Sequence, residues 1–266
     1  MKIRWIDTSC FEIVTDENER IVTDPFIDEC DNNPISSDEV EKMDYILITH
    51  THFDHITQLD KYYELYQPKI LCSTMSSMAL LNAFDLSGQC MFGMDHFESL
   101  DFGNTKITRI SAQHSIPSRK ERHLVRESVI GWQLPESLDE RYNNLMPSGY
   151  TDFSNFYIET KNNTRILFWG GGVTAEQINQ AKDLRPDILL IQIPSNPNKD
   201  IVKLIETVGA NLVIPHHHDT YYKSKDVDAM MNELKQDIES SLPSTKFISL
   251  KPGKWYKYEK NITEND

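Results

Sequence analysis

The sequence lacks long apolar runs and has few basic residues for its length. No stretch of about 18 apolar residues occurs in the 266 residues, and the N-terminal segment contains no apolar stretch of signal-peptide length. We therefore expect a protein that neither crosses a membrane nor is exported, and we predict a cytoplasmic location. The 27 Lys and Arg residues are outnumbered by 41 Asp and Glu residues, and this formal net charge of -14 disfavours a nucleic-acid partner.

Cysteine is also scarce. The four cysteines form no CxxC pair and have mostly apolar or small neighbours: Cys10, Cys30, Cys72 and Cys90. This usage is typical of reduced, buried thiols rather than of a disulfide framework.

The order of apolar segments predicts a single α/β domain over residues 1–266. Three short strands open the chain, and strand-helix steps follow at 44–68 and 68–84. Strands and helices alternate again from residue 155 to residue 242. Two similar halves of this kind predict a four-layer sandwich in which helices cover two packed sheets.

Residues 115–153 do not fit this alternation. They combine a basic cluster with later prolines, aromatics and acids, and only 127–134 reads as a strand. We expect most of this segment to be an excursion over the functional site, with a surface insertion of no role as the alternative. The basic cluster consists of Arg119, Lys120, Arg122, His123 and Arg126.

The stretch "ILITHTHFDH" places four potential metal ligands within six residues at the end of an apolar strand: His50, His52, Asp54 and His55. Residues i and i+2 of a strand share a face, so His50 and His52 can reach one point. Asp54 and His55 begin the next turn and can reach a neighbouring point. Imidazoles and carboxylates suit zinc or manganese. The spacing therefore predicts two adjacent sets of metal ligands.

Histidines also follow two later strands. His114 comes after "ITRISAQ", and "VIPHHHDT" places further candidates after "NLV": His216, His217, His218 and Asp219. Strand ends of an α/β sheet are where sites assemble, so we expect these side chains to share one pocket with the first cluster.

These motifs resemble the metallo-β-lactamase superfamily, whose signature HxHxDH matches residues 50–55. The "TDPF" strand before the signature, the lone His114 and the terminal "PHHHD" extend the resemblance over nearly the whole chain. Within the superfamily the sequence is most similar to the UlaG-like branch of L-ascorbate-6-phosphate lactonases. The resemblance implies the four-layer αββα fold and a metal-dependent hydrolase.

The resemblance also implies how the ligands divide. One ion would take His50, His52 and His114. A second ion would take Asp54, His55 and His217, with His216 as the alternative to His217. Asp54 would in addition orient water or accept its proton.

Two positions depart from the family pattern. Gly171, in "ILFWGGGVT", stands where the family has an aspartate that bridges two metals, and Asp7 stands where the family has a glycine. We expect a weaker second metal site and treat Asp7 as a possible substitute ligand or supporting group, with an ordinary turn aspartate as the alternative. Asp24 is expected to support a ligand or the signature turn. Asp219 is a further possible ligand or supporting residue.

The expected reaction is hydrolysis of an ester-type bond, in a lactone or phosphodiester, by metal-activated water. The substrate is expected to be small, polar and anionic, with one or two divalent ions, zinc or manganese, as cofactor. The alternative is a degenerate member of the fold that binds or regulates without turnover. A homo-oligomer is possible, and the sequence names no substrate-binding residue.

Overall fold

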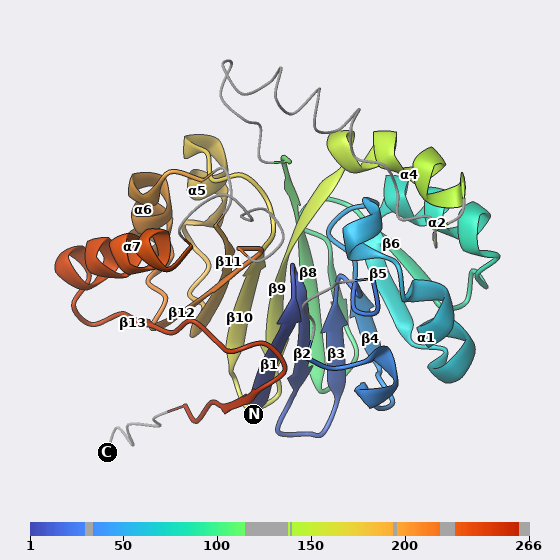
Figure 1. The fold of residues 1–266 in the computed structure, drawn as a ribbon, viewed down its shortest axis with the longest axis horizontal. Helices are drawn as coiled ribbons and strands as arrows, with labels where there is room; N and C mark the ends of the chain where they lie inside the picture. Colours follow the sequence, from blue (N-terminus) through green and yellow to red (C-terminus); the bar gives the residue numbers. More distant parts are fainter. Residues whose placement is uncertain (30–33, 115–137, 139, 194–195, 219–226, 261–266) are drawn as a thin grey trace.

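The computed structural model describes residues 1–29, 34–114, 138, 140–193, 196–218 and 227–260. Within these ranges the chain forms two seven-stranded sheets with helices on their outer faces (Figure 1). The layers follow the order helix, sheet, sheet, helix, which confirms the predicted four-layer α/β sandwich.

The N-terminal sheet has the strand order β14-β1-β2-β3-β4-β5-β6. Its strands are β1 (Lys2–Asp7), β2 (Cys10–Val14), β3 (Arg20–Thr23), β4 (Tyr45–Leu47), β5 (Lys69–Ser73), β6 (Met91–Met94) and β14 (Trp255–Lys257). The first three form the predicted antiparallel meander, and β3 to β6 run parallel. The elements beside this sheet are α1 (Leu59–Tyr66), α2 (Thr74–Phe84), α4 (Glu140–Thr151) and two 3-10 turns, η1 (Ser37–Glu39) and η2 (Phe53–His55).

The C-terminal sheet has the order β13-β12-β11-β10-β9-β8-β7. Its strands are β7 (Ser99–Asp101), β8 (Thr105–Ala112), β9 (Phe153–Thr160), β10 (Arg165–Trp169), β11 (Ile188–Gln192), β12 (Leu212–His216) and β13 (Lys246–Phe247). Three helices lie on its outer side: α5 (Ala175–Ala181), α6 (Asn198–Val208) and α7 (Val227–Ser241).

Alternating residues of the central strands pack into different layers. In β11, Ile188 and Leu190 join the core between the two sheets, while Leu189 and Ile191 join the core under α5, α6 and α7. A third core lies between the N-terminal sheet and its own helices. Successive strand residues point to opposite faces, so a continuous apolar run fits a strand that is buried on both sides.

The structure differs from the sequence-based expectation at the margins. Strands β6, β7, β13 and β14, which are short and partly exposed, were not predicted from sequence, and neither was the helix at residues 140–151. That helix lies inside the expected excursion. Residues 115–137, including the expected strand at 127–134 and the basic cluster, lie outside the described residues.

The strands that lead to the candidate site residues end at the same edge of the sandwich. β1, β3 and β4 run in one direction in the N-terminal sheet, as do β8, β10 and β12 in the C-terminal sheet. The residues after these strands include Asp24, His50, His114, Gly171 and His217. In the described parts of the chain, no helix is both long and apolar enough to cross a membrane.

Candidate metal centre

The first donor set consists of His50, His52 and His114. One ring nitrogen from each lies within 4.8 Å of the others. His50 and His52 follow β4 at alternate positions, and His114 arrives from the end of β8 in the other sheet. The first two are buried and His114 is partly exposed. The structure thus brings together the three histidines that the family resemblance implies as ligands of one ion.

The second donor set consists of Asp54, His55 and His217, and all three are buried. The Oδ2 atom of Asp54 lies 3.7 Å from Nε2 of His55 and 3.9 Å from Nε2 of His217. These separations exceed a hydrogen bond. They are close to the roughly 3.4 Å expected between two ligands of one ion with bonds of about 2.1 Å.

Burial controls the protonation of the rings. It lowers the pKa of His50, His52 and His217 well below the usual value, and neighbouring imidazoles lower it further. Burial also lowers the pKa of His55, but the carboxylates of Asp54 and Asp24 outweigh it and raise that pKa overall. Neutral imidazoles offer the lone pair that a metal ion needs.

Asp24 contacts both donor sets, one directly through His55 and the other through Thr49. It is fully buried, and its Oδ2 atom accepts hydrogen bonds from Nδ1 of His55 at 2.8 Å and from the Thr49 hydroxyl at 2.6 Å. The Thr49 hydroxyl uses its proton on Asp24, so its 3.0 Å contact with Nδ1 of His50 requires the ring to donate. Both rings therefore carry hydrogen on Nδ1. The lowered pKa of His50 keeps that ring neutral, with a lone pair on Nε2, whereas His55 has to lose the proton on Nε2 before that atom can bind a metal ion.

The hydrogen bonds of Asp24 agree with the supporting position expected from sequence, but two residues that contact His50 were not expected there. Thr49 links Asp24 to His50, and the Phe153 ring stacks on His50 with centroids 4.3 Å apart. A threonine before a signature and a phenylalanine at a strand start carry no distinctive sequence signal. Their roles follow only from the three-dimensional packing.

Asp7 is buried at the end of β1 and has an unusual environment. Its Oδ1 atom accepts the Thr8 backbone N–H at 2.6 Å, and its Oδ2 atom has no hydrogen-bond partner among the described residues. Burial raises the pKa of Asp7 to about 7, and the nearby Asp54 carboxylate adds to the increase. The carbonyl of Thr8 accepts the backbone N–H of His217 at 2.8 Å, so this turn packs directly on the second donor set.

Gly171 lies in a tight contact between strand ends. A Cβ atom there would lie 2.9 Å from the carbonyl oxygen of Gln113 and 3.0 Å from Cβ of Ala112. The N–H groups of Gly170 and Gly171 both point to Oδ1 of Asn155, at 3.0 and 3.2 Å. Because Gly171 has no side chain, residues 112 and 113, which lead to His114, pack closely against its backbone.

His216 lies outside the two sets. Nδ1 of His216 lies 3.1 Å from the Ser9 hydroxyl, and its Nε2 lies 3.2 Å from the Trp169 carbonyl oxygen. Burial lowers its pKa to about 3, so the ring is neutral; Nε2 donates to the carbonyl and Nδ1 accepts from Ser9. Asp219 lies outside the described residues.

The two donor sets fit divalent ions. Nε2 of His50 and Oδ1 of Asp54 are buried and have no hydrogen-bond partner within the described part of the chain. Buried polar atoms of this kind are costly unless a ligand satisfies them. Three imidazoles in one set, and two imidazoles with a carboxylate in the other, are donor combinations that zinc and manganese accept.

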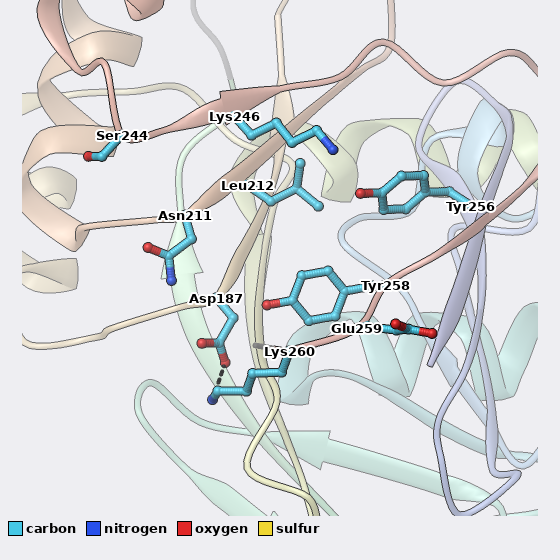
Figure 2. Close-up of a pocket in the computed structure, with 9 residues that line it drawn as sticks. All are labelled: Asp187, Asn211, Leu212, Ser244, Lys246, Tyr256, Tyr258, Glu259 and Lys260. Atoms are coloured by element: carbon cyan, nitrogen blue, oxygen red, sulfur yellow. Dashed lines mark hydrogen bonds and ion pairs between the residues drawn. The ribbon is translucent and has the colours of Figure 1, made fainter. Parts of the chain in front are cut away.

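A separate cavity of about 420 Å³ lies at the opposite ends of the strands (Figure 2). Asp187 and Asn211, which precede β11 and β12, line it together with the C-terminal Tyr256 and Lys260. Lys260 forms an ion pair with Asp187 at 2.9 Å. None of the six donor residues lines this cavity, so it is distinct from the candidate metal centre.

The sequence matches the family described as a beta-lactamase superfamily domain over residues 2–217. The chain belongs to the metallo-β-lactamase superfamily. Both donor sets lie within the matched range or at its end, which agrees with the resemblance drawn from the HxHxDH signature.

One relative and two solved structures are similar to this chain over nearly their whole length. A UPF0173 metal-dependent hydrolase from Archaeoglobus fulgidus is 24% identical over 264 residues, which cover 98% of this chain and 100% of the relative. The metallo hydrolase Igni18 from Ignicoccus hospitalis has a TM-score of 0.70 at 17% identity and covers 97% of this chain and 99% of its own. An isothiocyanate hydrolase from Delia radicum gut bacteria has a TM-score of 0.68 at 13% identity, covering 97% of this chain and 99% of its own.

Proposed function

We propose that the protein is a metal-dependent hydrolase that cleaves an ester-type bond, in a lactone or a phosphodiester, of a small anionic substrate. The observation that carries the proposal is the pair of adjacent donor sets, whose ligand atoms converge within 4.8 Å in each set. The names of the full-length relatives as metal-dependent hydrolases support it.

The residues of the site have distinct tasks in this reaction. When bound, a divalent ion supplies Lewis acidity, which brings the pKa of water towards neutrality and polarises the bond to be cleaved. Asp54 contributes Oδ2 to the second donor set, while its Oδ1 has no hydrogen-bond partner among the described residues and can accept a proton from water. Asp24 and Thr49 fix the ring orientations of His55 and His50.

The test combines metal analysis with a substrate screen. Protein purified without chelators, then stripped and reloaded with zinc or manganese, is assayed against a lactone, a phosphodiester, a phosphomonoester and a carboxylic ester. The proposal predicts bound metal and metal-dependent turnover of a lactone or phosphodiester. Absence of metal binding would overturn it.

One observation favours a second candidate, a binding or regulatory protein without turnover. Gly171 provides no bridging carboxylate, and the Gln113 carbonyl lies close to where its Cβ would be. This candidate predicts that the reloaded protein binds metal but hydrolyses no compound of the panel. The same experiment therefore separates the two candidates.

We further propose that Asp7 supplies the negative charge that Gly171 does not, directly or through a water molecule. Asp7→Asn preserves the shape of the side chain and removes its charge, so we expect weaker metal binding at the second donor set, by about tenfold to 100-fold. Metal titration by calorimetry measures the effect. Asp101→Asn, at an exposed aspartate of β7, is the control. Equal metal affinity of Asp7→Asn and the control would reject this role.

A further inference from the structure

Helix α4 lies directly on the signature turn. The Thr51 hydroxyl donates to the carbonyl of Leu145 at 2.9 Å, and the Tyr142 hydroxyl donates to the carbonyl of Thr57 at 3.3 Å. Tyr142 and Leu145 also join the core between α1, α2 and the N-terminal sheet. Hydrogen bonds before and after the turn thus fasten α4 to the segment that carries His52.

The same helix contacts the His52 ring itself. The backbone carbonyl of Met146 accepts a hydrogen bond from the imidazole. One turn further, a Cβ atom on Gly149 would lie 2.3 Å from Cδ2 and 2.8 Å from Nε2 of His52. The ring therefore occupies the space that any other residue at position 149 would fill.

The C-terminal end of α4 is also fixed. Asp152 accepts hydrogen bonds from the backbone N–H of Ser76 at 3.1 Å and from its hydroxyl at 2.9 Å, and it pairs with Arg109 at 3.2 Å. Ser76 belongs to the first turn of α2, and Arg109 is a buried residue of β8. These bonds connect the end of α4 to helix α2 and to the C-terminal sheet, so the helix has little freedom to move away from His52.

We propose that α4 is the element that orients His52 for metal binding, with the Met146 carbonyl and Gly149 as its positioning groups. This inference rests on the proposed function, because it takes His52 as a metal ligand. A histidine that donates one ring N–H to a carbonyl presents its other nitrogen as an electron-pair donor in a fixed direction. Gly149 allows the helix to approach closely enough for that hydrogen bond.

Gly149→Ala tests the inference, because alanine should stabilise the helix while its methyl group should disturb the position of the His52 ring. Alanine is a better helix former than glycine, so the substitution by itself does not weaken α4. The added methyl group has to displace the His52 ring, and we expect metal affinity at the first donor set to fall by about tenfold to 100-fold. The ion of the second donor set should remain, since its ligands do not include His52.

The measurements are calorimetric titration with zinc and elemental analysis after dialysis, with circular dichroism to monitor folding. Gly88→Ala is the matched control, because a Cβ there meets no atom within 4 Å and its φ is not positive. If Gly149→Ala loses one equivalent of bound zinc and Gly88→Ala keeps both, the result supports the inference. Equal titrations of Gly149→Ala and wild type overturn it.

Tyr142→Phe keeps the inference testable if Gly149→Ala does not fold. It removes the hydroxyl that bonds to the Thr57 carbonyl and leaves the ring packing in place. We expect a smaller loss of affinity, again confined to the first ion, and an unchanged titration would overturn the inference. Wild-type protein that binds no metal would instead overturn the proposed function, and this inference with it.

Discussion

Replacing His50 with alanine should remove the ion of the first donor set and reduce metal-dependent hydrolysis by more than 100-fold. His50 is the central ring of the site, with ring centroids 4.4 Å from His52 and 5.3 Å from His114. Loss of a ligand should exceed the roughly 10–100-fold effect of losing a group that only supports one. Elemental analysis of the purified variant and the hydrolysis assay measure the two effects.

His96→Ala provides the control for this substitution. His96 is exposed, and its Nδ1 accepts the backbone N–H of Ser111 at 3.0 Å, outside both donor sets. The control should keep wild-type metal content and activity. If folded His50→Ala bound as much metal as His96→Ala, the assignment of His50 as a ligand would be wrong.

The positions of His50 and His217 could be predicted from sequence because each follows a strand with a clear apolar pattern. "DYILITH" and "ANLVIPHHH" read as buried strands, and parallel strands deliver their carboxyl ends to one edge of a sheet. The four-layer arrangement followed from the same alternation of strands and helices. These features depend on local sequence, and the structure reproduces them.

The supporting contacts could not be predicted, because they join segments far apart in the chain. Thr49 links Asp24 to His50, and the Met146 carbonyl reaches His52 from a helix about 90 residues downstream. The sequence of that helix, "ERYNNLMPSGYT", contains a proline and a glycine that obscure its period. Packing on α2 and the signature turn overrides this weak propensity. For Gly149, the sequence indicates only a glycine within a helical segment, which does not show that the helix packs against His52.

Asp24→Asn should weaken both donor sets at once, although the side chain keeps its size and shape. In the native site Oδ1 of Asp24 accepts the Thr49 backbone N–H at 2.7 Å, and Oδ2 accepts from the Thr49 hydroxyl and the His55 ring. An asparagine has a single acceptor oxygen. In one orientation its NH₂ group faces the Thr49 N–H, and in the other it faces the hydroxyl and the ring N–H, so every orientation sets donor against donor.

The expected consequence is a loss of about tenfold to 100-fold in metal affinity at each set, because Asp24 holds His55 directly and His50 through Thr49. Its backbone adopts a left-handed conformation, with φ of 39°, which asparagine tolerates well, so backbone strain does not explain the loss. Asp85→Asn is the matched control, since Asp85 has a φ of 49° and is exposed after α2. Calorimetric titration of both variants measures the affinities. A loss confined to the second donor set would show that Thr49 does not transmit the support of Asp24 to His50, because only the direct hydrogen bond to His55 would then matter.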